Sequence, residues 1–331
     1  MKNQLNSLFY YYKRNNWMWY PKRFVSDFSN TKIDRPIFFL GNQGDGITLI
    51  SRFFRRHSQV VSVTGNNKYW TGADEMQRVM ELRLPYKLRL SGKTLSTDPH
   101  HSKYFQPRSW SYGIDELYQS YHNTEKDFSE KDKVMFEKAI REPLYRFGNG
   151  NNSRFIDKSQ VYTLKTRYIQ ALLDEYEPYF ILFTRNPYVT CARAAKGKAG
   201  DMNRYKFLSF DEKFNLCIEH WANCMETVIK DSKYLRNFRV YRFEDFLKEP
   251  KKQTKDLCDF LDLNFEEEML PAPNQFIPFG TKYGKRWYPI KQEINKPYLE
   301  KMTDKQLDKV ETRCGKMALE FGYHKDWKKN I

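Results

Sequence analysis

The sequence predicts a three-layer α/β fold, in which helices flank both faces of a central parallel sheet. Short apolar runs rich in strand-forming residues alternate with stretches of helical pattern, and the runs occupy 36–41, 60–63, 154–157, 179–184 and 238–243. Because these runs are mostly continuous rather than alternating, they are typical of parallel strands buried on both sides. The chain has 331 residues and no linker-like stretch, so we expect one large domain.

The rest of the chain is arranged around these runs. We expect a single domain at 32–325, preceded by an extension at 1–31 that interleaves aromatic and basic residues. Residues 80–150 are polar, aromatic and less regular, which predicts an insertion or a lid over the sheet. Apolar periodicity predicts two late helices, at 250–262 and 303–321.

The first run leads into a glycine-rich loop and then into a predicted helix, where Ile47 and Ile50 recur at helical spacing. Gly41 and Gly46 have the spacing of the phosphate-binding pattern G-x-x-x-x-G-K-[ST], and Thr48 fills its hydroxyl position. Ile47, however, occupies the position of the lysine. The usual mechanism of ATP or GTP chemistry therefore lacks its cation here.

A strand, a glycine loop and a helix can bind an anion without that lysine. Free backbone N–H groups and the positive end of the helix dipole both face the loop. Asp45 directly precedes the predicted helix, and we expect its carboxylate to cap the N–H of Ile47 or Thr48.

A second candidate binding segment is "ILFTRNPYVTCAR". Arg185 stands at the carboxyl end of the fourth run, where open α/β sheets bind their ligands. Pro187, after Asn186, suits the first position of a helix. Arg193 follows two turns along that helix, so we expect it to point at the same anion as Arg185.

Composition and charge narrow the class of protein. Apolar residues make up 40% of the chain, which fits a globular protein, and the formal charge of +16 favours an anionic partner. Five cysteines form no CxxC pair, so the sequence predicts neither a disulfide framework nor a zinc site. No run reaches the roughly 18 apolar residues of a membrane span, and no signal peptide is recognisable, so we expect a cytoplasmic protein.

Five segments occur in the order and approximate spacing of a known family. They are "FFLGNQGDGITLI", "FIDKSQ", "LFTRNPYVTCAR", "YRFEDFLKEPKKQTKDLCDFLDL" and "GTKYGKRWYP". With them the chain resembles sulfotransferases that use 3′-phosphoadenosine-5′-phosphosulfate, especially bacterial and carbohydrate-type members with a P-loop-like fold. The resemblance covers roughly 35–325.

The resemblance implies a donor site in which the glycine loop embraces the 5′-phosphosulfate and Arg185 grips the 3′-phosphate. The family usually has Lys or Arg where Gly44 stands and Ser where Arg193 stands, so the first departure removes a cation and the second adds one. The implied donor-binding residues are Gly41, Asn42, Gln43, Gly44, Asp45, Gly46, Ile47, Thr48, Arg185, Arg193, Lys282, Lys285 and Arg286.

The resemblance also suggests catalytic residues. Lys158 matches a family lysine beside the sulfate, where it would offset charge on the leaving phosphate and replace the cation missing at Gly44. The base that takes the acceptor's proton is expected to be Glu75 or Asp74, which follow the second run. His101, in "DPHHS", is the alternative base.

These observations predict an enzyme that transfers a sulfuryl group from 3′-phosphoadenosine-5′-phosphosulfate to a hydroxyl of a carbohydrate or glycoconjugate, without a metal ion. The expected partner is a glycan or glycolipid, not a specific nucleic acid. For the extension at 1–31, packing on the domain surface is favoured, with peripheral membrane contact or base stacking as the alternatives. Two alternatives stay open: a P-loop-type phosphotransferase such as a kinase, and a non-catalytic nucleotide- or polyanion-binding protein.

Overall fold

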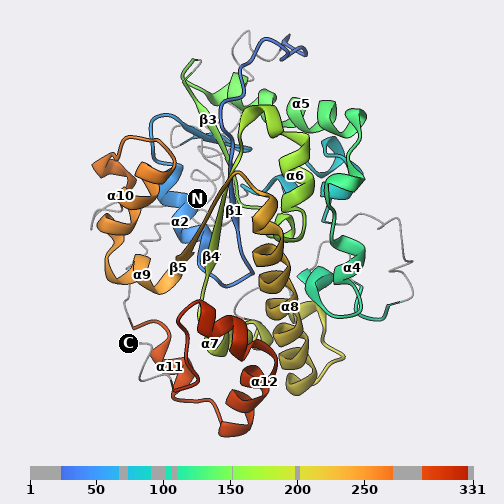
Figure 1. The fold of residues 1–331 in the computed structure, drawn as a ribbon, viewed down its shortest axis with the longest axis vertical. Helices are drawn as coiled ribbons and strands as arrows, with labels where there is room; N and C mark the ends of the chain where they lie inside the picture. Colours follow the sequence, from blue (N-terminus) through green and yellow to red (C-terminus); the bar gives the residue numbers. More distant parts are fainter. Residues whose placement is uncertain are drawn as a thin grey trace, which may run out of the picture.

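The computed structural model describes residues 24–66, 74–90, 102–105, 110–150, 152–197, 202–270 and 293–326. Its centre is a five-stranded parallel sheet with the strand order β2-β3-β1-β4-β5 (Figure 1). The strands are β1 (Ile37–Leu40), β2 (Val60–Ser62), β3 (Arg154–Asp157), β4 (Tyr179–Thr184) and β5 (Asn237–Arg242). The predicted α/β fold with a central parallel sheet is confirmed, and each strand begins and ends within one residue of its predicted run.

The described helices connect and cover these strands. They are α2 (Ile47–Phe54), α3 (Met76–Val79), α4 (Tyr118–Tyr121), α5 (Glu130–Phe147), α6 (Thr166–Leu172), α7 (Pro187–Ala195), α8 (Phe210–Asp231), α9 (Phe243–Lys248), α10 (Pro250–Phe260), α11 (Lys296–Leu299) and α12 (Asp304–Glu320). The two late helices predicted from periodicity correspond to α10 and α12. Among the described residues, no helix combines the length and the apolar composition needed to cross a bilayer.

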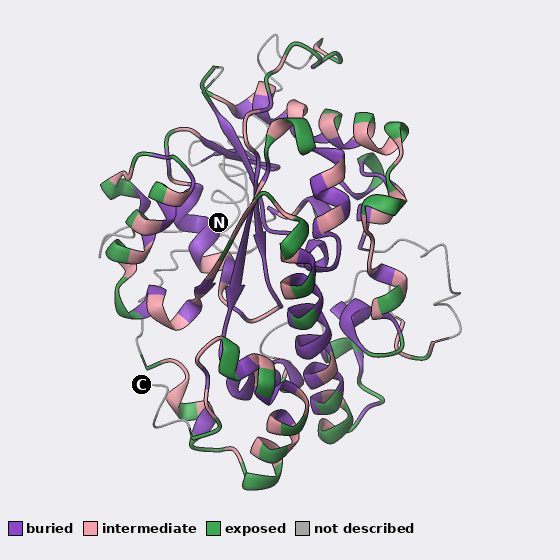
Figure 2. Cartoon of the chain, in the orientation of Figure 1, coloured by how far each residue is buried: buried purple, intermediate pink, exposed green. Residues whose placement is uncertain are grey.

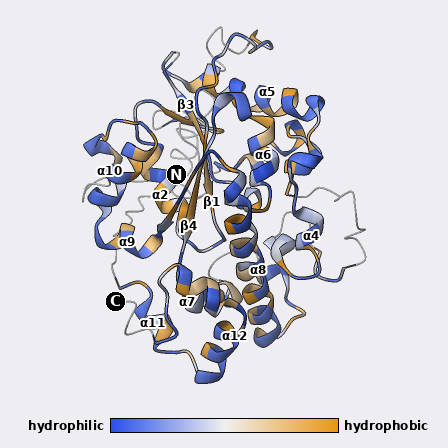
Figure 3. Ribbon diagram, viewed as in Figure 1, coloured by the Kyte–Doolittle hydropathy of each residue, from blue (hydrophilic) through white to orange (hydrophobic). Residues whose placement is uncertain are grey.

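The helices form two layers, one on each face of the sheet. Helices α2, α9 and α10 lie on one side, and α5, α6 and α8 lie on the other (Figure 1). Helices α7, α11 and α12 gather near the carboxyl ends of the strands. Strands β1 to β4 and the inner sides of the helices are largely buried, whereas the edge strand β5 is only partly buried (Figure 2). Apolar residues follow the buried surfaces (Figure 3).

Strand β1 shows how one short segment supplies both layers. Successive strand residues point to opposite faces. Phe38 packs on Phe136 and Phe180 in the core under α5 and α8, whereas Phe39 packs on Phe54 and Phe183 in the core under α2 and α10. An apolar run without polar alternation is therefore what this central strand requires.

The region at 80–150 contributes a covering helix as well as irregular segments. Helix α5 packs against β2 and β3, and buries Phe136, Ile140 and Leu144 in the core. Ser129 begins the helix, because its hydroxyl accepts a hydrogen bond from Asp132 N. Before α5, the described parts of this region are mostly short 3-10 turns such as η6 (Trp110–Gly113).

Candidate donor site

The glycine-rich loop connects β1 to α2 at the carboxyl edge of the sheet. Gly46 has a φ of 86° and is the residue that caps the start of α2. Gly41 has a φ of 137°, and a Cβ atom placed there would lie 2.4 Å from the carbonyl oxygen of Phe183 in β4. Both positions need glycine, Gly41 because the loop passes close to the neighbouring strand and Gly46 because its φ is positive.

Asp45 does not cap the helix, so the prediction made from the sequence was wrong on this point. No side chain caps α2. The Asp45 carboxylate instead accepts hydrogen bonds from Asn42 N at 2.8 Å and from Thr190 Oγ1 at 3.3 Å, which tie the loop to α7. Asp45 is fully buried, and this burial raises the pKa of its carboxyl group to about 8. The carboxyl group therefore holds a proton at neutral pH and adds little negative charge to the loop.

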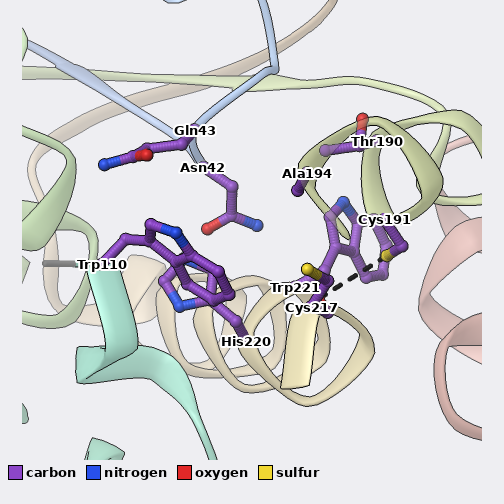
Figure 4. Close-up of a pocket in the computed structure, with 9 residues that line it drawn as sticks. All are labelled: Asn42, Gln43, Trp110, Thr190, Cys191, Ala194, Cys217, His220 and Trp221. Atoms are coloured by element: carbon purple, nitrogen blue, oxygen red, sulfur yellow. Dashed lines mark hydrogen bonds between the residues drawn. The ribbon is translucent and has the colours of Figure 1, made fainter. Parts of the chain in front are cut away.

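Two other side chains of the loop, Ile47 and Asn42, supply no cation in place of the lysine of the phosphate-binding pattern. Ile47 is buried in the core between the sheet and α2, so its side chain faces away from any ligand. Asn42 is also buried, and its amide points into a small cavity beside Trp110 and Trp221 (Figure 4). Neither atom of that amide has a hydrogen-bond partner among the described residues. The loop consequently offers an anion its backbone rather than a cationic side chain.

Arg185 lies directly against this loop, as its place at the end of β4 predicted. Its Nη1 donates to the carbonyl oxygen of Gly44 at 2.9 Å. Its Nε and Nη2 donate to Asn295 Oδ1 at 3.1 and 2.6 Å, and its guanidinium stacks on the Phe243 ring, 5.0 Å from the centroid. Burial, and next the charge of Arg193, lower the pKa of Arg185 to about 10, so the group stays charged at neutral pH.

Arg193 lies close to Arg185, as the spacing along the predicted helix suggested. It sits in the last turn of α7, and its guanidinium stacks on the ring of Tyr298, 5.0 Å from the centroid. Its Nε has no hydrogen-bond partner among the described residues. Two arginines whose charges act on each other thus lie near the carboxyl edge of the sheet, one of them against a loop of backbone amides, an arrangement suited to a multiply charged anion.

Four residues of this site were not predicted from the sequence. Asn295 and Tyr298 come from the segment around α11, and Glu244 follows β5. Glu244 Oε1 accepts hydrogen bonds from Asn295 Nδ2 at 2.5 Å and from the backbone N of Asn186 at 3.1 Å. The hydroxyl of Tyr323, near the end of the chain, lies 2.8 Å from Glu244 Oε2 and 3.1 Å from Thr184 O.

A second cluster surrounds Lys158 at the end of β3. Its Nζ lies 2.7 Å from Glu75 Oε1 and 3.2 Å from Asp74 Oδ1, and all three residues are largely buried. Asp74 also contacts Arg52 of α2, at 3.3 Å, and Arg55 directly after that helix, at 3.2 Å. The structure thus brings Lys158, Asp74 and Glu75 to one location, and nothing in the sequence indicated that they pair with one another.

The charges in this cluster control one another. Burial alone would raise the pKa of Asp74, but Arg52, Lys158 and Arg55 outweigh it and hold that pKa well below its usual range. Burial likewise opposes ionisation of Glu75, yet Lys158 and Arg78 lower its pKa. The two carboxylates in turn raise the pKa of Lys158 despite its burial. All three groups are charged at neutral pH.

The residues next to Lys158 hold this cluster in position. Asp157 accepts hydrogen bonds from Met76 N at 2.8 Å and from Ser159 N at 2.7 Å, and Ser159 Oγ accepts one from Gln77 N at 3.0 Å. These contacts fix the start of α3 on the end of β3, and Glu75 is the N-cap residue directly before α3. The segment "FIDKSQ" therefore orients Lys158 and also holds the start of α3, and with it Glu75, against Lys158.

Several predicted residues lie outside the described part of the chain. They are His101, Lys282, Lys285 and Arg286. Within the described ranges, no group of three or more histidine, cysteine or acidic residues is arranged to hold a metal ion.

Comparison with known proteins identifies the family to which this geometry belongs. A model described as "Sulfotransferase family" matches residues 36–267, which include the glycine loop, Lys158 and both arginines. The chain belongs to the sulfotransferase family. No curated protein sequence matches it significantly.

Solved sulfotransferase structures share the fold of this family member. The sulfotransferase domain from the curacin biosynthetic pathway superposes with a TM-score of 0.53 at 14% identity, covering 89% of this chain and 99% of that domain. The sulfotransferase STF9 from Mycobacterium avium superposes with a TM-score of 0.50 at 11% identity, covering 90% of this chain and 79% of that one. At such low identity these likenesses concern the fold alone.

Proposed function

We propose that this sulfotransferase transfers a sulfuryl group from 3′-phosphoadenosine-5′-phosphosulfate to a hydroxyl group of a carbohydrate or glycoconjugate. The observation that carries the proposal is the position of Arg185, whose guanidinium touches the carbonyl of Gly44 while Arg193 lies nearby. The donor has one phosphate on its 3′-oxygen and a phosphosulfate on its 5′-oxygen. A pair of arginines beside a loop of amides matches two such anionic groups at neighbouring positions.

The residues of the loop and of α7 would hold the donor. The loop amides and the start of α2 would bind the phosphosulfate, and Arg185 with Arg193 would bind the 3′-phosphate. Because Asp45 is protonated at neutral pH, the loop does not repel the ligand. The charges of the described residues are therefore complementary to the negative charges of the donor.

The cluster at the end of β3 would carry the chemistry. Lys158 would neutralise charge that develops on the leaving phosphate as its bond to sulfur breaks. Glu75 would take the proton from the acceptor hydroxyl as its oxygen bonds to sulfur. Asp74 is the poorer base, because three cations contact its carboxylate. We assign Asp74 instead to holding Lys158 in place.

Donor binding tests the first half of this proposal. Heat stability should rise with 3′-phosphoadenosine-5′-phosphate and much less with ATP and magnesium, since a ligand stabilises a protein by binding its native state. Equal stabilisation by both would favour the kinase alternative. Transfer of radiolabelled sulfate from the donor to a panel of glycans and glycolipids tests the second half, and donor binding without transfer to any acceptor would favour the non-catalytic alternative.

A matched pair of arginine variants locates the donor. Arg185→Ala should weaken binding of 3′-phosphoadenosine-5′-phosphate by about 1.5–3 kcal/mol, the range for hydrogen bonds to charged groups. Arg154 is equally buried, but lies at the amino end of β3, where it donates to Arg35 O at 3.0 Å. Arg154→Ala should lower stability and leave donor affinity unchanged. Unchanged affinity in Arg185→Ala would refute the assignment.

A further inference from the structure

We infer that Asn295 is a positioning residue that keeps the charge of Arg185 available to the 3′-phosphate and thereby sets the preference for a 3′-phosphorylated donor. The inference rests on the proposed function and assigns a role within that site. Asn295 directly precedes α11 and lies between Arg185 and Glu244, with its side chain in contact with both.

The orientation of the Asn295 amide follows from chemistry. Arginine can only donate hydrogen bonds and an ionised glutamate can only accept them. The Asn295 oxygen therefore faces Arg185, at 3.1 Å from Nε and 2.6 Å from Nη2, and its nitrogen faces Glu244 Oε1 at 2.5 Å. The amide cannot be turned round without placing two donors, and likewise two acceptors, against each other.

This arrangement fixes one edge of the guanidinium and leaves another for a ligand. Asn295 occupies the edge formed by Nε and Nη2, while Gly44 O takes one N–H of Nη1. Arginine has five N–H bonds, so two are not used by described residues. A phosphate is a strong acceptor for such N–H bonds.

The amide of Asn295 matters because the carboxylate of Glu244 lies on the side of it opposite Arg185. Asn295 separates the cation of Arg185 from the anion of Glu244, whose second oxygen is already engaged by Tyr323. A neutral amide orients the guanidinium without cancelling its charge. An aspartate at this position would form an ion pair with Arg185, and an alanine would let Arg185 turn toward Glu244. In both cases the phosphate would lose its partner.

The test compares two ligands that differ only in the 3′-phosphate. Binding of 3′-phosphoadenosine-5′-phosphate and of adenosine 5′-phosphate is measured by calorimetry, directly or in competition, for the full chain and its variants. Asn295→Asp and Asn295→Ala should each weaken the first ligand by about 10- to 100-fold, the loss of a charged hydrogen-bonding partner. The second ligand should change by about threefold or less, since its charge lies farther from Arg185.

Asn223 in α8 provides a matched control. It too bridges an arginine and a carboxylate, because Arg313 Nη2 donates to its Oδ1 at 2.8 Å and its Nδ2 donates to Asp115 Oδ1 at 2.8 Å. Asn223→Asp and Asn223→Ala should alter stability without changing the ratio of the two affinities. Thermal unfolding of every variant shows that it is folded, and Asn295→Ser serves if one of the first two is not.

The outcomes separate this inference from the proposed function. If the Asn295 variants keep the affinity ratio of the original protein, the role of Asn295 is refuted while the donor assignment stands. If the original protein binds both ligands equally, the donor assignment fails and the inference fails with it. An equal loss of affinity for both ligands in the Asn295 variants would mean that the residue only maintains the fold of the site, which also refutes the inference.

Discussion

At the scale of single residues, Asp45 shows how burial can change the meaning of a charged side chain. An aspartate inside an anion-binding loop looks unfavourable, but this one is fully buried and its pKa is raised to about 8 by that burial. It then behaves as a neutral hydrogen-bonding group that joins Asn42 in the loop to Thr190 in α7. The free energy of unfolding should therefore depend on pH in a way that shows whether Asp45 is protonated.

The first prediction concerns Asp45→Asn. In the folded protein the carboxyl group of Asp45 keeps its proton up to about pH 8. The ordinary pKa of an aspartate is 3.8, so in the unfolded chain the same group loses its proton near that pH. Between these values the folded state binds more protons than the unfolded chain, so the free energy of unfolding falls as pH rises, by at most about 1.4 kcal/mol per pH unit. Asp45→Asn should remove this fall, because its amide retains both contacts and does not ionise in that range.

Urea unfolding of both proteins between pH 5 and pH 8 measures the difference. Subtracting the two curves isolates residue 45 from all other titrating groups. A constant difference across this range would show that Asp45 is already ionised at pH 5.

The second prediction separates chemistry from structure within the Lys158 cluster. Glu75→Gln should lower turnover by about 10²–10⁴-fold, the usual cost of losing a general base, and Lys158→Ala by about 10²–10³-fold. Both should retain affinity for 3′-phosphoadenosine-5′-phosphate, which depends on Arg185. Steady-state rates with the labelled donor and calorimetry provide these two quantities. Normal turnover in Glu75→Gln would move the role of base elsewhere.

Asp74 should respond differently from its two neighbours. Its buried carboxylate contacts Arg52, Arg55 and Lys158, so Asp74→Asn leaves three cations with less compensation. Removing one partner of a buried ion pair costs about 3–5 kcal/mol. This third prediction is checked by urea unfolding, where a loss under about 1 kcal/mol would contradict it.

At the scale of elements, the unit of β1, the loop and α2 depends on glycine for two separate reasons. Gly46 has a φ of 86°, and a Cβ atom there would lie 2.1 Å from the ring of Phe243. Gly150 has a similar φ of 81°, but a Cβ atom there would meet no atom of the described residues within 4 Å. The two positions therefore separate backbone strain from steric overlap.

The fourth prediction compares alanine at these two glycines. Gly150→Ala should cost only the strain of a left-handed residue, about 1–2 kcal/mol. Gly46→Ala should cost more, because Phe243 must also move, and Phe243 supports Arg185 by stacking. We expect lower donor affinity in Gly46→Ala alone, measured by calorimetry after urea unfolding has given the stability of each variant. Equal stability losses would show that Phe243 moves without cost.

The sequence predicted the strands better than the segments between them. The five strands of the described residues were all found. The central strands β1 and β4 are buried, continuous apolar runs, a pattern that needs no knowledge of its neighbours, whereas the edge strand β5 is only partly buried and alternates apolar with polar residues. Helix α5 was not predicted, because 130–147 is highly charged and only a narrow stripe, including Phe136 and Ile140, is buried. Periodicity is weak in such a helix.

The site was predicted in part for the same kind of reason. Arg185 and the glycine loop are marked by local patterns at the ends of strands. The pairing of Lys158 with Glu75 joins residues 83 positions apart, and the contact of Arg185 with Asn295 joins residues 110 positions apart. Nothing in the local sequence marks such contacts, so they required the folded structure.

At the scale of the whole molecule, the formal charge of +16 should influence how the donor arrives. Charges of one sign attract a multiply charged ligand over a distance, and salt shortens that distance from about 30 Å at 0.01 M to about 8 Å at 0.15 M. This attraction mainly affects the association rate rather than the lifetime of the complex.

The fifth prediction follows from that attraction. The association rate of 3′-phosphoadenosine-5′-phosphate should fall by about tenfold or more as salt rises from about 0.01 M to 0.15 M, with a smaller change in the dissociation rate. Stopped-flow mixing provides both rates. Arg185→Ala is the control, because removing a direct contact should mainly raise the dissociation rate. A salt effect confined to dissociation would contradict the prediction.

The contacts of Tyr323 can form only late in the synthesis of the chain. A ribosome makes the chain from its amino end, so β4 and Glu244 emerge well before the tyrosine whose hydroxyl lies between Thr184 and Glu244. The nascent chain can thus form its sheet before the hydroxyl of Tyr323 is available to contact Thr184 and Glu244. Translation that ends prematurely, or a protease that removes residue 323, would release a protein in which Thr184 and Glu244 have lost the hydroxyl that joins them.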